Sequence, residues 1–555
     1  MPKRLAITIS GAVSLGSYEA GVLYETLGAI SQHNLDQATT ADEKIFVDVL
    51  TGASAGGMTA TIAAQKLLFE ASALSGAYSN SFYLPWVADV SLEGLLAMHG
   101  SDDATKSILS SQLVVDLSKR YLTQRYSSHL DPKRERHVAC AEKLSLGLAL
   151  ANLNGVDYGL PLRPKGQFIY TRHQDELTVS FRPDDASDDV LDFWDPLRNA
   201  AVSCGAFPFA FRVVDVVRHA SEYPPMPPRT SAIAPSQSFS YTDGGTFQNE
   251  PLGLAKRLVD GIDHHLDTDN RFYLFVAPGP RSSTANADFN ANKANYREAA
   301  VRIIGAVFNQ ARFQDWIKAE QVNDQIRLFN ERAYALRDML KGNAAAVIAR
   351  AQKLQAAADE ILPALFKNAP AGAPPAETLD HARNRLKQQF AADYSALSAK
   401  TRDAWIDSIL TLEAAAHLAS RDEMTIYGIT ADDQELASFE LFSFAGFFDR
   451  RYRDHDYDVG RTKAQEFLTM KGILGLPNGL RFAPEKIRDI DHSLDGLHLQ
   501  GMDRNTRIAV RERLRQRSHE ILKELGIDPI IIGGAVREAI DVALIKPALD
   551  KLLKL

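Results

Sequence analysis

Two predicted strands that each run through a glycine-rich turn into a helix constrain the fold of this chain most. Residues 5–10 (LAITIS) form a short apolar run typical of a buried strand, and the turn 11–16 leads into a segment with apolar residues at helical spacing. A second predicted strand, 45–50, runs through the turn 51–57 into a helix over 58–70. Because strands alternate with helices, we expect a mostly parallel sheet covered by helices on both faces.

Beyond about residue 290 the sequence changes character, with few glycines and prolines and many residues that favour helices. The further predicted elements are strands at 168–171, 177–181, 238–242 and 272–276, and helices at 294–365, 379–437 and 487–555. The stretch 369–376 has the composition of a proline- and alanine-rich linker. We therefore expect an α/β domain over 1–285, a helical region over 286–480, and a helical segment over 481–555 that packs on the rest.

The composition excludes several classes of protein. With 45% hydrophobic residues, the 555-residue chain has too much apolar material to be disordered. Its two cysteines, Cys140 and Cys204, are too few for a disulfide scaffold, and we expect both to be small buried side chains. The 62 Lys and Arg residues against 70 Asp and Glu give a net charge of -8, which argues against a nucleic-acid partner.

The sequence also bears on where the protein acts. It has no uninterrupted apolar run of about 18 residues, so we predict no transmembrane helix. Two basic residues precede the first apolar run as in a signal peptide, but Ser, Thr and Gly interrupt that run early, which favours a buried strand instead. We expect a cytoplasmic protein, and export by a dedicated secretion system stays open.

Ser54 is the candidate nucleophile. It is the central residue of a Gly-x-Ser-x-Gly pattern, in which Gly52 and Gly56 flank it between a predicted strand and a predicted helix. Such a turn lifts the serine hydroxyl out of the sheet, and the flanking positions must be nearly free of side chain because neighbouring backbone crowds them. The amino end of the following helix favours the negative charge that develops during ester cleavage.

Asp243 is the candidate base. A serine hydroxyl needs a neighbour that takes its proton, and none of the fourteen histidines is set apart by its surroundings. Asp243 instead follows a predicted strand and precedes Gly244 and Gly245, so it falls at the rim of the sheet, where α/β sites form. Taken alone, this pattern is also that of an ordinary Asp-Gly turn.

In this order, the turn 11–16, the motif around Ser54 and the segment 243–245 resemble the patatin-like phospholipase family over roughly residues 5–280. The small-residue segment 200–211 and the pair Trp86 and Asp89 also resemble that family. The resemblance implies a three-layer α/β sandwich with a mostly parallel central sheet, followed here by a mainly helical C-terminal region. It also implies an acyl hydrolase in which Ser54 attacks a carboxylic ester and Asp243 is the base, with no cofactor and no metal.

The chemistry adds a requirement at Asp243. A free aspartic acid has a pKa of about 3.9, too low for an efficient base near neutral pH, so we expect a desolvated site that raises it. An apolar groove for the acyl chain would desolvate the carboxyl, and Phe207, Phe209 and Phe211 are candidates to line that groove, although plain core packing explains them equally well.

The first glycine-rich turn departs from the family pattern. Where that family has three glycines, a variable residue and a cation before the last glycine, this chain has Gly11, Ala12, Val13, Ser14 and Leu15 before Gly16. The oxyanion hole that the resemblance implies is made of the N–H groups of residues 11–13, which alanine and valine still supply. Valine is a poor residue for a positive φ. The missing cation argues against phospholipase specificity more than against ester hydrolysis.

The C-terminal part carries two further patterns. Residues 441–461 interleave aromatic residues with arginines and aspartates, which predicts an ion-pair network that joins this region to its neighbour rather than a metal site. Residues 535–555 predict an amphipathic helix with the Lys and Leu composition of a membrane-surface helix, although a packed terminal helix is the commoner case. We expect transient peripheral membrane contact at most.

The sequence therefore predicts a lipid acyl hydrolase of the phospholipase A or lysophospholipase type, with a lipid or other acyl ester as its substrate. Two alternatives remain open at this stage. One is an esterase of the α/β-hydrolase type with a histidine-containing triad, and the other is a non-catalytic lipid-binding protein that kept the fold.

Overall fold

The computed structural model describes most of the chain. The described residues are 1–97, 99–103, 105–124, 135–162, 165–182, 191–223, 229–230, 233–263, 270–279, 289–290, 314–367, 378–415, 424–439 and 443–524, with isolated positions between 299 and 311 and between 546 and 553. The predicted linker at 369–376 and most of the predicted helix at 535–555 lie outside these residues.

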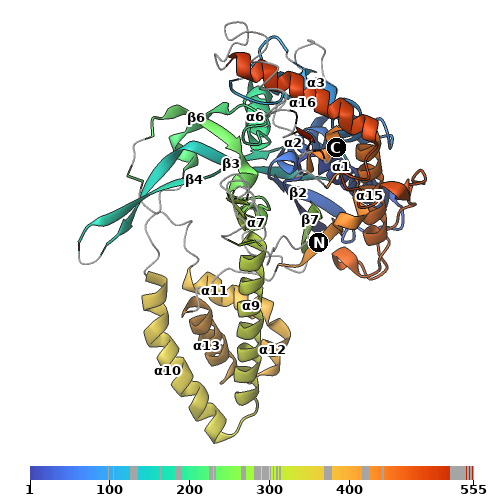
Figure 1. Ribbon diagram of the computed structural model, residues 1–555. Coiled ribbons are helices and arrows are strands. Elements are labelled where there is room, and N and C mark those ends of the chain that lie inside the picture. The colour runs from blue at the N-terminus through green and yellow to red at the C-terminus, as the bar shows by residue number, and fades with distance from the viewer. Residues whose placement is uncertain are drawn as a thin grey trace.

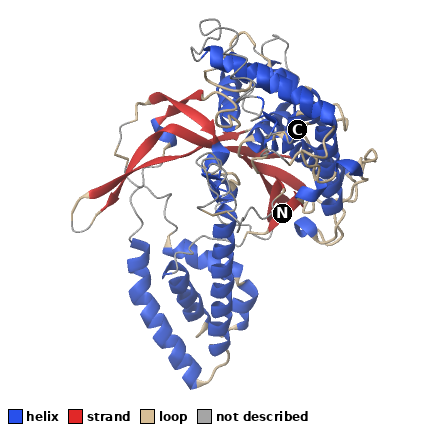
Figure 2. Ribbon diagram, viewed as in Figure 1, coloured by secondary structure: helices blue, strands red, loops and turns tan. Residues whose placement is uncertain are grey.

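A mixed eight-stranded sheet forms the centre of the fold (Figure 2). Its strands are β1 (Lys3–Ile9), β2 (Ile45–Gly52), β3 (Cys140–Pro161), β4 (Gln167–Phe181), β5 (Val214–His219), β6 (Ser236–Asp243), β7 (Arg271–Pro278) and β8 (Ile426–Ala431). The order is β5-β6-β3-β2-β1-β7-β8, and β4 pairs with β3 outside this path. Strands β3, β2, β1, β7 and β8 are parallel to one another, which confirms the expected mostly parallel sheet.

The other pairs, β3 with β4, β3 with β6 and β5 with β6, are antiparallel. Strands β3 and β4 extend out of the body of the molecule as a long ribbon (Figure 1). The two separate strands predicted at 168–171 and 177–181 are parts of the single strand β4, and β3 was not predicted at all. Because β3 is rich in leucine and alanine, which favour helices, its local sequence gave no strand signal.

Helices cover both faces of the sheet, as predicted. The helices of this part of the chain include α1 (Gly16–Leu35), α2 (Ala55–Phe69), α3 (Leu92–Leu96), α4 (Ser111–Ser118), α6 (Leu191–Cys204) and α7 (Leu252–Asp263). Alternate side chains of β1 face opposite layers, because successive residues of a strand point to opposite sides. Leu5, Ile7 and Ile9 pack in the core with α1 and α2, whereas Ala6 packs with Leu252 and Ala255 of α7.

A helical extension follows the sheet along the chain. It comprises α9 (Gln314–Met339), α10 (Ala345–Lys367), α11 (Leu379–Gln389), α12 (Ala391–Ala396) and α13 (Arg402–Ala415). These helices share a hydrophobic core of their own, centred on Trp405 and Leu386, and project from one end of the molecule (Figure 1). The predicted helical character of 314–367 and 378–415 is confirmed.

The C-terminal region also returns to the sheet, which the sequence did not predict. Residues 426–431, expected within a helix, are the edge strand β8 beside β7. The expected boundary at residue 285 therefore does not separate the sheet from the rest, because residues 426–431, a short run that includes strand-favouring Ile, Tyr and Thr, pair with β7. Within 487–524, the predicted helix exists only as α16 (Arg504–Glu524), since 487–503 contains no more than a 3₁₀ turn at His492–Leu494.

Helix α15 (Arg450–Leu468) packs directly on α1. The two backbones approach so closely that a Cβ on Gly460 would lie 2.2 Å from the carbonyl oxygen of Tyr18. The predicted ion-pair network is confirmed here: Nε of Arg461 lies 2.7 Å from Oε1 of Glu25 on α1, and Arg488 pairs with Asp458. No helix in the described part of the chain has the length and apolar character that crossing a bilayer requires.

Candidate active site

Ser54 occupies a strained turn between β2 and α2. Its φ of 51° and ψ of -128° are unusual for a residue with a side chain. The flanking glycines are required by space, as predicted, because a Cβ on Gly52 would lie 2.4 Å from the backbone of Gly56. Likewise, a Cβ on Gly56 would lie 2.2 Å from the carbonyl oxygen of Ser10. The turn holds the hydroxyl of Ser54 at the carboxyl end of β2, beside the first turn of α2.

Asp243 ends β6 and meets Ser54. The antiparallel pairing of β6 with β3 places Asp243 opposite Leu150. From there its Oδ2 accepts a hydrogen bond of 2.5 Å from the hydroxyl of Ser54. The N–H of Gly245 donates to the other carboxylate oxygen at 2.7 Å, and a Cβ on Gly244 would lie 1.9 Å from the carbonyl oxygen of Ala149. The two segments that the sequence singled out, 189 residues apart, therefore meet in space.

Burial changes the acidity of this carboxyl. Asp243 is 1% exposed, and desolvation raises its pKa from 3.8 to about 7, although the hydrogen bonds from Ser54 and Gly245 oppose the rise. The direction is the one that the sequence argument required for a base. Burial also raises the pKa of the Cys204 thiol, and the negative charge of Asp243 adds to that effect. Cys140 and Cys204 are both buried free thiols, as predicted.

The turn 11–16 lies against Ser54, but not all of it can bind an oxyanion. A Cβ on Gly11 would lie 3.0 Å from Cβ of Ser54, so the two segments are in contact. The N–H of Gly11 donates to the carbonyl oxygen of Asn249 at 3.0 Å, so Gly11 is not a free donor and its predicted role is wrong. The N–H groups of Ala12 and Val13 have no hydrogen-bond partner among the described residues.

Val13 adopts the conformation that valine disfavours, with a φ of 53°. Such strain persists only where the surroundings enforce it, and it is typical of functional sites. Gly16, in contrast, has an ordinary φ of -52°, and its missing side chain makes room for the ring of Trp86, which a Cβ would approach to 2.7 Å.

Comparison with known protein families identifies this part of the chain. Residues 7–256 match the family model of the patatin-like phospholipases. These residues form a patatin-like phospholipase domain. A search of curated proteins found no match. The family is one of lipid acyl hydrolases, and both Ser54 and Asp243 lie within the matched residues.

Asn249 links the two halves of the site within the patatin-like domain. Besides accepting from Gly11 through its carbonyl, it donates from Nδ2 to the carbonyl oxygen of Gly11 at 3.3 Å. A Cβ on Gly245 would lie 2.6 Å from its Oδ1, so its side chain fills the space between the first turn and the segment after Asp243. The sequence did not single out Asn249, because one asparagine in a loop has no pattern that distinguishes it.

An apolar cavity, which we call the inner chamber, opens beside Ser54. It encloses about 860 Å³, including the open space at its mouth. Its walls are almost entirely apolar and include Ser54, Val13, Trp86, Val114, Leu117, Tyr121, Val202, Phe207, Phe211 and Phe447. Two of the three predicted groove residues, Phe207 and Phe211, therefore line it. Phe209 does not: its φ of 67° turns the chain, and its side chain is 71% exposed.

The C-terminal region completes this chamber. Phe447, which lies far beyond the patatin-like domain in sequence, is one of the wall residues, and Phe444 packs edge-on against Phe207 with ring centroids 5.4 Å apart. The hydroxyl of Ser14 donates to the carbonyl oxygen of Ser443, which joins the same segment to the first turn. No pattern in the sequence indicates that residues 443–447 reach the site.

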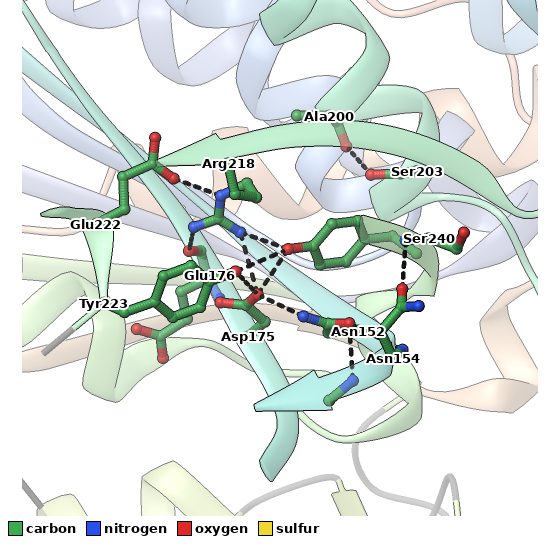
Figure 3. A network of polar contacts seen from close by, with 12 residues as sticks. Asn152, Asn154, Asp175, Glu176, Ala200, Ser203, Arg218, Glu222, Tyr223 and Ser240 are labelled. Carbon is green, nitrogen blue, oxygen red and sulfur yellow. Dashed lines mark hydrogen bonds and ion pairs between the residues drawn. The ribbon is translucent and has the colours of Figure 1, made fainter. Parts of the chain in front are cut away.

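A buried polar network supports the strand that carries Asp243 (Figure 3). Oδ2 of Asp175 on β4 accepts hydrogen bonds from Tyr241 of β6 at 2.7 Å, from Tyr223 at 3.0 Å and from Arg218 of β5 at 3.1 Å. Arg218 also donates to the carbonyl oxygen of Glu176 at 2.8 Å. Because these contacts join β4, β5 and β6, they fix the position of β6 two residues before Asp243.

Proposed function

We propose that this protein is a serine acyl hydrolase of the phospholipase A or lysophospholipase type that uses Ser54 and Asp243 as a catalytic dyad. The observation that carries the proposal is the 2.5 Å hydrogen bond from the Ser54 hydroxyl to a carboxylate buried beside an apolar chamber. An aspartate with a pKa of about 7 is matched to proton transfer near neutral pH, whereas an ordinary one is too weak a base.

The proposed reaction has two stages. Oγ of Ser54 attacks the ester carbonyl carbon while its proton passes to Asp243, and the N–H groups of Ala12 and Val13 stabilise the resulting oxyanion. Asp243 then gives the proton to the leaving alcohol, which departs from an acyl-enzyme. A water molecule that loses a proton to Asp243 attacks the acyl carbon, and the released Ser54 takes that proton back.

The inner chamber supports an acyl substrate over a polar one. Its walls are apolar and adjoin the Ser54 hydroxyl, so an acyl chain bound there would place its ester carbonyl at the nucleophile. We propose transient contact with a lipid surface for the same reason, since a substrate with such a chain resides mainly in membranes or micelles. Residues 525–545 and the terminal leucine lie outside the described part of the chain, so the helix predicted at 535–555 adds nothing to this argument.

Two variants and two matched controls test the dyad. Ser54→Ala and Asp243→Asn are each expected to lower kcat for a nitrophenyl butyrate by about 10³-fold or more, since a nucleophile or its base is lost. Ser395→Ala and Asp380→Asn, which are exposed in the helical extension, are expected to keep wild-type turnover. Thermal unfolding of all four variants checks that the fold is intact.

The outcomes separate the alternatives. Full activity in Asp243→Asn, together with loss of activity on replacing one histidine, would favour a histidine-containing triad. A fluorophosphonate probe that fails to label Ser54 in the folded wild-type protein would favour a non-catalytic lipid-binding protein.

A further inference from the structure

A second cavity, which we call the outer cavity, adjoins the inner chamber. It encloses about 1130 Å³ including open solvent, and it shares four wall residues with the inner chamber: Val114, Val202, Gly205 and Phe211. Gly205 also adjoins the nucleophile, because a Cβ there would lie 3.7 Å from the carbonyl oxygen of Ser54. The two cavities therefore adjoin each other beside the proposed nucleophile, and these four residues belong to both linings.

Helices α4 and α6 divide their side chains between the two cavities. Leu117 and Ser118 of α4 line the inner chamber, whereas Ser111 and Val115 line the outer cavity. This division follows from helical spacing, because residues four apart share a face. On α6, Ala201 lines the inner chamber, and the outer cavity is lined by residues that include Arg198 and Asn199.

The outer cavity has the opposite character to the inner chamber. Four cationic side chains line it, from Lys106, Lys119, Arg198 and Arg212, against one carboxylate, Asp215. Two of the cations are paired: Lys106 with Asp103 at 3.0 Å and Arg198 with Asp195 at 2.8 Å. Arg198 is buried, and its Nη1 also donates to the hydroxyl of Ser118 at 3.3 Å, which joins the two helices between the cavities.

The other two cations are uncompensated. Neither Lys119 nor Arg212 has an acidic partner within 4 Å among the described residues. Their charges lie in a protein whose net charge is -8, so this local excess of positive charge is contrary to the overall balance. A cavity with unpaired Lys and Arg side chains favours an anion, and above all a phosphate, which accepts several charge-assisted hydrogen bonds.

We propose that the inner chamber and the outer cavity together form one site for an anionic amphiphile, with the acyl chain in the inner chamber and a phosphate-bearing head group at Lys119 and Arg212. This proposal rests on the proposed function and extends it, since it assigns the head group of the substrate. In this proposal Lys119, which directly follows α4, and Arg212, in the segment after α6, supply the positive charge that Leu15 does not supply in the first turn.

Binding of three probes to the wild-type protein tests the proposal without any turnover. We choose octyl phosphate, the uncharged ether 1-O-octylglycerol and inorganic phosphate, each measured by calorimetry below the micelle concentration. Octyl phosphate is expected to bind about tenfold more tightly than either of the others, because only it fills both cavities. The preference over octylglycerol is expected to shrink as salt is added.

The double variant Lys119→Gln/Arg212→Gln is expected to bring octyl phosphate and octylglycerol within about twofold of each other. The charge-keeping variant Lys119→Arg/Arg212→Lys is expected to retain most of the preference. A matched control, Lys400→Gln/Arg332→Gln, removes two exposed cations of the helical extension and is expected to bind all three probes as the wild type does. Lys119→Gln alone changes an exposed side chain, so it provides a folded variant if the double variant unfolds.

Three results would overturn the proposal: equal affinity of the wild type for octyl phosphate and octylglycerol, an unchanged preference in the double variant, or inorganic phosphate that binds as tightly as octyl phosphate. The last would mean a free-phosphate site with no link to the inner chamber. Failure of the proposed chemistry is a separate result, namely ester hydrolysis that survives in Ser54→Ala, and it leaves the binding measurements intact.

Discussion

Ester hydrolysis is expected to rise steeply as the pH passes through neutrality, because Asp243 must be ionised before it can accept the proton of Ser54. Its pKa is raised to about 7 by burial, so about half of the molecules carry the ionised form at pH 7. Below that value kcat/KM is expected to fall about tenfold for each pH unit, and above about pH 8 it is expected to be constant.

The carboxyl of Asp243 also makes the free energy of unfolding depend on pH. The rise of its pKa from 3.8 to about 7 corresponds to about 4 kcal/mol by which burial favours the protonated form. A carboxyl with a higher pKa in the folded state binds its proton more tightly there. The buried, protonated carboxyl of Asp243 therefore contributes fully to the free energy of unfolding below pH 3.8. This contribution is lost as the pH rises through 7. Asp243→Asn removes this loss and is expected to be more stable than the wild type at pH 8.

Two measurements check this reasoning. One is kcat/KM for a nitrophenyl ester between pH 5 and 9, followed at the isosbestic wavelength of the product, with circular dichroism at each pH to confirm folding. The other is urea unfolding of the wild type and Asp243→Asn at pH 5 and 8. A rate profile that is flat over this range, or an unfolding free energy that favours the wild type equally at both pH values, would refute the assignment of Asp243 as a buried base.

Three structural predictions follow from the contacts around the site. Asp175→Asn is expected to lower the free energy of unfolding by about 2 kcal/mol in urea titrations, because it removes one of the two carboxylates that pair with the buried guanidinium of Arg218 and leaves only Glu222. An unchanged free energy of unfolding would contradict this. Phe447→Ala enlarges the inner chamber, and we expect the ratio of kcat/KM for octanoate to acetate esters to fall about tenfold, whereas an unchanged ratio would remove Phe447 from the acyl site. Gly460→Val is expected to lower the free energy of unfolding by more than about 2 kcal/mol, since its side chain would meet the backbone of α1. Gly28→Ala on α1, which has open space around it, is expected to raise the free energy of unfolding by about 0.5 kcal/mol. Equal effects of the two substitutions would contradict the close contact between α15 and α1.

Ser54 and Asp243 could be predicted because the sequence patterns that single them out lie within a few residues of each. The glycines around Ser54 and after Asp243 are dictated by backbone crowding within a few residues, and the strands that precede both are short apolar runs. The pairing of the two segments followed from the general rule that sites form at the carboxyl ends of strands. The raised pKa of Asp243 followed from the chemistry that a carboxylate base requires.

What the sequence could not predict depends on contacts between distant segments. Strand β8 is a six-residue run within a predicted helix, and its pairing with β7, far away in the sequence, gives it a place in the sheet. Gly11 lost its predicted role because the carbonyl oxygen of Asn249 takes its N–H, and nothing near residue 11 indicates that bond. Phe209 was grouped with two neighbours by spacing alone, and a single positive φ turned it outward. In each case the outcome depends on the position of other segments in space, whereas the sequence indicates only the local conformational preference of a residue.

The position of Phe447 in the sequence determines when, during synthesis, the lining of the inner chamber becomes complete. During synthesis, Asp243 leaves the ribosome 204 positions before Phe447 and Ser54 leaves earlier still, whereas α15, which packs on α1, follows Phe447. Until residues 426–431 have been made, one edge of the central sheet lacks β8, and until Phe447 has been made, the inner chamber beside Ser54 lacks one of its wall residues. A nascent chain thus contains Ser54 and Asp243 well before the lining of the inner chamber is complete.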